Sequence, residues 1–307
     1  MNTHSKTRGD KMKQIGPLYL LEGKHNSKVP YSRSIYINCK EKVLIDTGAD
    51  PEILTDVHKQ YGVANIMNTH YHPDHTSHNH LFPEAVKWIN PIEFKTARTI
   101  EGIARANGVY QEWGEVGIEM WKKQLPREWV QNLGEITRSY DYDKEYIFGD
   151  VKVLFLHTPG HTSGLASPYF PDLGVVYVSD YDMTTFGPWY NGTDGDIDDF
   201  IASGKYLTDL DVTTYVTGHQ KGIFSKSEFV EEMEKFLQII ETRNEIIERY
   251  AKQGLTFEEL TNIGIFYPAN TLNVPIFQTW ERSGIRKHLQ RLGLTVLKSN
   301  GELVIQK

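Results

Sequence analysis

The sequence predicts an α/β fold with a helical extension at its carboxyl end. Two observations predict this class. Short apolar, β-branched runs alternate with helical stretches through the first two thirds of the chain, and the last third has mostly helical spacing. At 307 residues the chain exceeds the usual size of one domain. We therefore expect a main domain over residues 15–224 and a helical appendage over residues 225–307.

The main domain is expected to have two halves of similar plan. In the first half we expect strands over Leu18–Leu21, Ser34–Asn38, Val43–Asp46 and Asn65–Asn68, and a helix over Pro51–Tyr61. In the second half we expect strands over Val151–Leu156, Val175–Val178 and Thr214–Val216, and a helix over Ile197–Leu207. Residues 70–80 are too rich in histidine and turn formers to be core, so this segment, directly after a strand, predicts a functional loop.

Between the halves lies an insertion with helical character, about residues 91–132. It carries Tyr110, Trp113, Trp121 and Trp129 at positions that are not evenly periodic. Two interpretations are open: these aromatics line a lid over a site, or they pack a helical excursion onto the sheet.

The appendage is expected to contain three helices and a hairpin. The predicted elements are an amphipathic helix over Ser227–Gln253, a second helix opened by a capping box at Thr256–Glu259, a third over Val274–Leu292, and a hairpin over Thr295–Ile305 that turns at Asn300 and Gly301. This order resembles a winged helix. Lys and Arg together equal Glu in number across the appendage, with no Asp, so nucleic acid is not the expected partner. Packing against the main domain, or homodimerisation, is favoured.

Charge and composition narrow the partners and the location. The formal net charge is -7, with acidic and basic residues interspersed, which gives no reason to expect nucleic acid or an anionic membrane as partner. A single cysteine cannot form an internal disulfide. Residues 1–14 lack the apolar centre of a signal peptide, and no later run is long enough to span a membrane. We expect a cytoplasmic protein whose first dozen residues form a disordered leader or a cloning remnant, since Met12 could itself be a start.

The most informative segment runs from Thr69 to His75 and reads THYHPDH. Three imidazoles and a carboxylate within six residues would be costly to bury without partners, and a tight turn after a strand can aim them at one point. Metal ligation is the favoured explanation, and a chance cluster of surface histidines is the alternative.

Three later residues make the chance explanation weaker. His161, Asp180 and His219 each stand where an apolar strand releases the chain into a loop. One such residue would be unremarkable, but three in this order after the first motif favour a single metal centre. Asp46, in the segment LIDTG, could cap a local turn.

These motifs resemble those of the metallo-β-lactamase superfamily over roughly residues 18–222. The family's His-x-His-x-Asp-His motif, later His, bridging Asp and final His all have counterparts here, and Asp46 matches its early Asp-x-Gly element. The resemblance implies an αββα sandwich. It also implies a first metal held by His70, His72 and His161, a second held by Asp74, His75 and His219, Asp180 bridging both, and Asp46 supporting the loop from behind.

The resemblance also implies a cofactor and a reaction. Imidazole and carboxylate ligands suit two divalent transition-metal ions, zinc first, with iron or manganese as alternatives. A hydroxide bridging the metals would attack a carbonyl carbon, and the catalytic carboxylates Asp74 and Asp180 would accept its proton.

Nearby residues receive lesser roles. His78 and His80 are expected at the surface or behind the ligands, and His157 is expected to be structural. For Tyr181, Trp189 and Tyr190, lining the substrate pocket and packing under the loop remain equally open.

The resemblance does not select the substrate, because members of the superfamily act on many. An antibiotic-degrading enzyme would be exported, and nucleases of the superfamily usually have positive surface. Glyoxalase-II-like thioesterases carry a helical carboxyl-terminal part, as expected here. We therefore predict hydrolysis of a small carbonyl ester or thioester. A lactonase, an RNA-cleaving endonuclease with a winged-helix end and an iron-dependent persulfide dioxygenase stay open.

Overall fold

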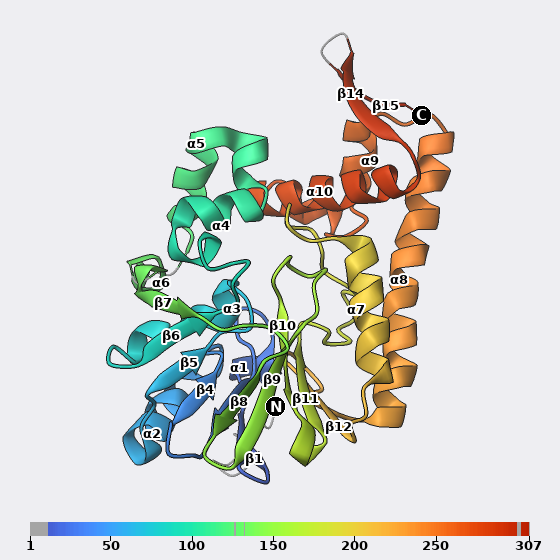
Figure 1. Cartoon of the computed structure of the whole chain (residues 1–307). Coiled ribbons are helices and arrows are strands. Elements are labelled where there is room, and N and C mark those ends of the chain that lie inside the picture. The colour runs from blue at the N-terminus through green and yellow to red at the C-terminus, as the bar shows by residue number, and fades with distance from the viewer. Residues whose placement is uncertain (1–11, 126, 132, 300–301, 307) are drawn as a thin grey trace, which may run out of the picture.

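The fold is a layered sandwich of two sheets with helices on both outer faces (Figure 1). The computed structural model describes residues 12–125, 127–131, 133–299 and 302–306. The predicted αββα arrangement is confirmed. Of the expected leader only Met12 is described, where it begins a strand, and the predicted turn at Asn300 and Gly301 lies outside the described residues.

The first sheet has seven strands in the described part of the chain, in the order β1-β2-β3-β4-β5-β6-β7. They are β1 (Met12–Ile15), β2 (Leu18–Leu21), β3 (Ser34–Ile37), β4 (Val43–Ile45), β5 (Asn65–Met67), β6 (Val86–Ile89) and β7 (Ile136–Ser139). Strands β1 to β4 form an antiparallel meander, and β4 to β7 are parallel. The carboxyl ends of β4, β5 and β6 therefore meet at one edge.

The second sheet has six strands within the described residues, in the order β13-β12-β11-β10-β9-β8. They are β8 (Glu145–Phe148), β9 (Val151–His157), β10 (Ala166–Phe170), β11 (Val175–Ser179), β12 (Thr214–Thr217) and β13 (Ile223–Ser225). Strand β11 is parallel to β12, and β9 and β11 are both antiparallel to β10. The carboxyl ends of β9, β11 and β12 thus also lie at one edge.

Apolar side chains from both sheets form the central layer, including Ile35 and Val43 from the first and Phe155 and Tyr177 from the second. Helix α2 (Pro51–Tyr61) covers the outer face of the first sheet. Helices α7 (Ile197–Asp209) and α8 (Lys226–Lys252) cover the second. Removing this apolar surface from water is the main stabilising term.

The insertion between β6 and β7 is helical, as predicted. It contains α4 (Ile100–Ala106), α5 (Val109–Lys122) and α6 (Arg127–Gln131), and it has an apolar cluster of its own. Trp121 and Trp129 are 7% and 3% exposed within that cluster, so packing explains both of them.

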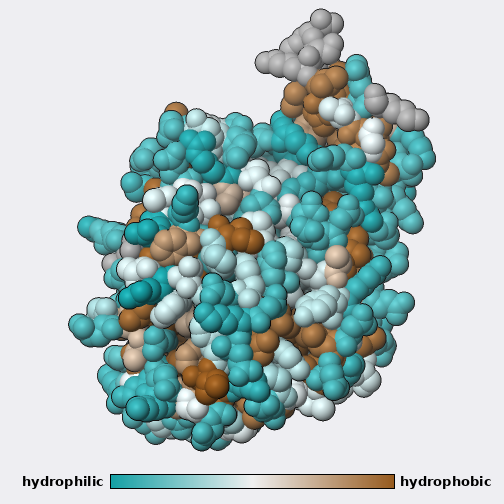
Figure 2. Space-filling model, in the orientation of Figure 1, coloured by the Kyte–Doolittle hydropathy of each residue, from teal (hydrophilic) through white to brown (hydrophobic). Residues whose placement is uncertain are grey.

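The appendage follows the predicted order of three helices and a hairpin: α8, α9 (Phe257–Ile263), α10 (Pro275–Arg291) and the strands β14 (Thr295–Ser299) and β15 (Glu302–Gln306). Helix α10 lies across the molecule from α5 to α8 (Figure 1). The face in Figure 2 is mostly hydrophilic, and hydrophobic residues gather at the hairpin. The appendage shares one apolar cluster with α7 and β11. The predicted domain boundaries stay predictions.

None of the helices in the described ranges combines the length and the apolar character needed to cross a membrane.

Candidate metal centre

The predicted ligands leave the carboxyl ends of four strands. The loop after β5 carries the THYHPDH segment and includes α3 (Pro73–Thr76), whereas the loops after β9, β11 and β12 carry His161, Asp180 and His219. Because these strand ends share one side of the sandwich, residues up to 149 positions apart in the chain, from His70 to His219, come together.

The structure arranges the seven predicted ligands in two groups. In each group the potential ligand atoms lie within 4.8 Å of one another. The first group is His70, His72, His161 and Asp180, and the second is Asp74, His75, Asp180 and His219. The described residues contain these two groups and no other of this kind. This is the division that the resemblance implies, and the roles of the individual residues stay predictions.

Asp180 lies between the two groups and turns one oxygen toward each. Its Oδ2 is 3.0 Å from Nε2 of His161, and its Oδ1 is 2.9 Å from Nε2 of His75. The same two oxygens are 3.9 Å from His70 Nε2 and 3.7 Å from His219 Nε2, respectively. A carboxylate that bridges two cations needs this placement.

Backbone carbonyls orient two of the imidazoles. Nδ1 of His161 donates to the carbonyl of Trp189 at 2.9 Å, and Nδ1 of His219 donates to the carbonyl of Ser27 at 2.8 Å. Since a carbonyl can only accept, each Nδ1 carries the proton. In the neutral ring, Nε2 is then left as a bare lone pair directed at the cluster, as in metal-binding histidines.

Several imidazole nitrogens that face the cluster lack a hydrogen-bond partner among the described residues. The Nε2 atoms of four histidines are buried and have no hydrogen-bond partner among the described residues: His70, His72, His75 and His219. The other ring nitrogen of His72, Nδ1, faces Nε2 of His161 at 2.9 Å. Buried polar atoms without partners are rare because they are costly, and a cation would satisfy several of these together. The donor set therefore fits divalent metal ions.

The electrostatics agree with this fit. Burial lowers the pKa values of His70 and His72 well below the usual range, which favours the neutral, ligating form. Burial opposes ionisation of Asp180, but the neighbouring His75 and His161 outweigh it and hold the pKa of Asp180 well below its usual range. Burial also lowers the pKa of His219, yet the nearby carboxylates, Asp180 foremost, raise it to about 9. An ionised Asp180 carboxylate thus lies among imidazoles, of which those of His70 and His72 favour the neutral form.

Asp46 lies behind the metal loop and is hydrogen-bonded to it, and its supporting role stays a prediction. It is fully buried, and its oxygens accept from the backbone N–H of Thr69 at 2.8 Å and the Thr69 hydroxyl at 2.9 Å. Asp46 and Ser179 both have positive φ, 57° and 49°, at the ends of β4 and β11. Such strain in non-glycine residues is concentrated at functional sites. Gly48 lies so close to the loop that a Cβ there would be 1.8 Å from the carbonyl oxygen of Asp74.

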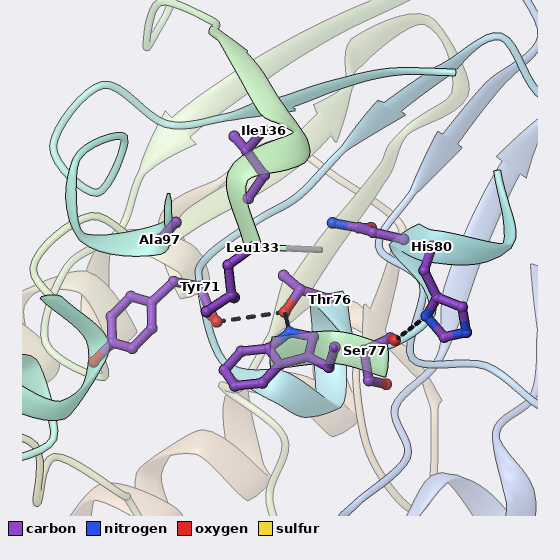
Figure 3. A pocket seen from close by; sticks show the side chains of 9 residues that line it. Tyr71, Thr76, Ser77, His80, Ala97, Leu133 and Ile136 are labelled. Atoms are coloured by element: carbon purple, nitrogen blue, oxygen red, sulfur yellow. Dashed lines mark hydrogen bonds between the residues drawn. The ribbon is translucent and has the colours of Figure 1, made fainter. Parts of the chain in front are cut away.

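The insertion is attached to the same loop. Nε1 of Trp129 donates to Oγ1 of Thr76 at 2.8 Å, and that hydroxyl donates to the carbonyl of His72 at 3.0 Å. Figure 3 shows the small cavity beside this contact, lined by Tyr71, Thr76 and Leu133 among others. The insertion thus contacts the metal loop through the Trp129 indole, and Tyr71 of that loop belongs to the apolar cluster of the insertion.

The structure also locates the residues near the motif that were not predicted as ligands. His78, His80 and His157 each make a hydrogen bond to a backbone carbonyl and belong to neither metal group. Tyr181 and Tyr190 are fully buried, so packing describes them. Trp189 is the exception, because its ring lies 5.1 Å from the rings of both His72 and His161.

Comparison with known proteins decides the family. Residues 29–219 match the model of the metallo-beta-lactamase superfamily. The chain belongs to the metallo-β-lactamase superfamily.

Its relatives cover part of the chain. A hydroxyacylglutathione hydrolase of Brucella ovis is 30% identical over 115 residues, which are 38% of this chain and 32% of that protein. An uncharacterized protein of Aquifex aeolicus is 25% identical over 158 residues, 48% of this chain and 65% of that protein. The chain thus spans less than two thirds of the length of either relative.

Solved structures share the fold over nearly the whole chain. A metallo-beta-lactamase family protein from Thermus thermophilus has a TM-score of 0.67 at 21% identity, over 95% of this chain and 99% of that one. A beta-lactamase domain protein from Burkholderia ambifaria has a TM-score of 0.72 at 11% identity, over 99% and 96%. At these identities the likeness concerns the fold alone.

Proposed function

We propose that the protein hydrolyses a small carboxylic ester or thioester with two divalent transition-metal ions, zinc first, with iron or manganese as alternatives. The observation that carries the proposal is the convergence of seven imidazole and carboxylate side chains into two groups that share Asp180. The thioester is supported by the Brucella relative, whose name describes hydrolysis of an acyl-glutathione, which is a thioester.

The ligand residues would hold the metals as the resemblance implies. Divalent cations bound there would lower the pKa of water toward neutrality and polarise a carbonyl oxygen. Asp74 and Asp180 would accept a proton during the reaction, and Asp74 is 13% exposed. Trp189 covers His72 and His161 on one side and limits the access of water to them. Cytoplasmic location and homodimerisation remain predictions.

The test begins with elemental analysis of the purified protein, which should contain about two equivalents of transition metal. Chelation should abolish hydrolysis, and re-addition of zinc, iron or manganese should identify the ion that restores it. A panel of thioesters, esters, lactones and RNA then tests the substrate class. Oxygen consumption with glutathione persulfide tests the dioxygenase alternative. Preferred cleavage of RNA or lactones, or oxygen consumption, would contradict the proposal.

A further inference from the structure

Three aromatic side chains connect the metal cluster to the appendage. Trp189 lies against His72 and His161, with ring centroids 5.1 Å apart in each pair. The ring of Trp280, on α10, meets Trp189 edge-on at 5.5 Å, and Tyr267 lies 6.0 Å from Trp280. We refer to Trp189, Tyr267 and Trp280 as the aromatic wall.

Two hydrogen-bond donors of the aromatic wall are unused. Nε1 of Trp189 donates to the hydroxyl of Tyr267 at 2.7 Å, but that hydroxyl donates to no acceptor among the described residues. Nε1 of Trp280 is buried and likewise has no partner in the described ranges. Packing alone does not account for these groups, because phenylalanine would fill similar space without leaving a donor unpaired.

The aromatic wall is held rigidly by the appendage and its neighbours. The Glu281 carboxylate accepts the backbone N–H groups of Ile265, Phe266 and Tyr267, at 2.6, 3.0 and 2.9 Å, and so fixes the segment that carries Tyr267. Arg243 of α8 donates to the carbonyl of Pro188 at 2.6 Å, directly before Trp189. A binding surface fixed in this way loses little conformational entropy when a ligand binds.

The rings themselves remain accessible in part. Trp189 and Trp280 are only half-buried, in contrast to the fully buried Tyr181 and Tyr190 of the same region. A group that lies on these rings would be next to the cluster where, under the proposed function, the carbonyl reacts. The acyl part is common to esters and thioesters, so a site for it does not depend on the leaving group.

We propose that the aromatic wall binds the acyl part of the substrate and selects acyl groups with a planar apolar ring and a hydrogen-bond acceptor. This inference rests on the proposed function. The rings of Trp189 and Trp280 supply the apolar contact, and the free donors of Trp280 and Tyr267 receive the acceptor.

Binding of carboxylic acids, the products of such a reaction, tests this without requiring turnover. Isothermal titration of the metal-containing protein would compare acetate, 3-phenylpropionate and phenoxyacetate. The last two have the same shape, but phenoxyacetate has an ether oxygen where 3-phenylpropionate has a methylene group. We expect 3-phenylpropionate to bind about tenfold more tightly than acetate, and phenoxyacetate about threefold more tightly again.

Two substitutions of Trp280 distinguish the contribution of its ring from that of its Nε1 donor. Trp280→Ala should reduce the preference for 3-phenylpropionate over acetate to about twofold. Trp280→Phe should keep most of it but remove the advantage of phenoxyacetate over 3-phenylpropionate. The matched control is Trp113→Phe, because Trp113 Nε1 donates to Thr279, next to Trp280 in the chain, but lies on the insertion. This control should leave all three affinities unchanged.

The outcomes distinguish the two proposals. Two results would contradict acyl binding by the aromatic wall. One is equal affinity of the wild-type protein for acetate and 3-phenylpropionate, and the other is an equal loss of the preference for 3-phenylpropionate in Trp280→Ala and Trp113→Phe. An unchanged phenoxyacetate advantage in Trp280→Phe would overturn the role of its donor. If the expected affinities are found but no ester or thioester is hydrolysed, only the proposed function fails.

Discussion

Oδ2 of Asp46 lies 2.7 Å from Nδ1 of His75, and both side chains are fully buried. The contact joins the end of β4 to the metal loop. It also fixes which nitrogen of His75 faces the cluster, because a carboxylate that accepts from Nδ1 leaves Nε2 as the free lone pair. We therefore expect Asp46 to act on the metal centre through His75 and Thr69.

Replacing Asp46 with Asn should weaken metal binding by about ten- to a hundredfold, since the amide cannot orient His75 and Thr69 as the carboxylate does. Asn tolerates the positive φ of this position, so the backbone should keep its conformation. Competition with a chromogenic chelator measures the affinity. Asp172→Asn, at an exposed turn, is the control. Equal affinities in wild type and Asp46→Asn would show that Asp46 only caps its turn.

The hydrogen bond of the Trp129 indole should affect both stability and metal affinity. Trp129→Phe removes the donor to Thr76 and should cost about 1 kcal/mol of stability from the hydrogen bond, in addition to lost packing. Because Thr76 bonds to the carbonyl of His72, metal affinity should fall as well. Trp121→Phe removes an indole from the same apolar cluster and should lower stability without altering metal affinity. Denaturant unfolding and chelator competition measure the two quantities. Identical behaviour of both variants would reduce Trp129 to a packing residue.

Glu93 should make stability depend on pH. It is 1% exposed, and burial first, then the charge of Asp194, raises its pKa to about 8, against donors from Thr162 and Asn90. A carboxyl with a raised folded-state pKa contributes stability that is complete below its unfolded pKa, near 4.5, and is lost as pH rises through 8. In that window the folded state binds one proton more, so the free energy of unfolding should fall by up to about 1.4 kcal/mol per pH unit.

The variant Glu93→Gln, which cannot ionise, should remove this slope. Urea unfolding at several pH values between 5 and 8 gives the free energy of unfolding of wild type and variant. Contributions from the metal ligands cancel in the difference between these two free energies. Glu101→Gln, on the exposed side of the insertion, should show the wild-type slope. A constant difference between wild type and Glu93→Gln across this range would mean that Glu93 does not titrate there.

Much of the fold was predictable because local patterns agree with the final structure. Helix α2 begins and ends at the predicted Pro51 and Tyr61, since Asp50 caps its first turn and Gly62 follows its last. Strand β10 was missed because Pro168 lies inside it, and proline usually argues against a central strand. The ladder to β11 pairs only Tyr169 and Phe170, so Pro168 lies beyond its end. Strand β8 was missed because its short pattern is half-exposed.

The ligands were predictable, whereas most of their supports were not. Histidine and aspartate bind metals through their side chains, so the ligand motif can be recognised in the amino-acid sequence. The carbonyls of Trp189 and Ser27 that orient His161 and His219 would be the same with any residue at those positions. The aromatic wall depends on a contact between α10 and the loop after β11, which no local spacing reports. In the insertion, Trp121 and Trp129 resembled pocket residues only because aromatics serve both roles.

Asp180 gives the most demanding test of the metal centre. Its two oxygens face the two groups, so Asp180→Asn would remove the anionic charge that both share and leave an amide nitrogen facing one of them. We expect loss of one of two metal equivalents and a fall in turnover by orders of magnitude, because both cations are needed in the proposed reaction. Substrate affinity should change much less, since the aromatic wall is untouched. The control is Asp198→Asn, at an exposed position in the first turn of α7. Elemental analysis and kcat against KM separate these effects, and two retained metals with near-normal kcat would contradict a bridging Asp180.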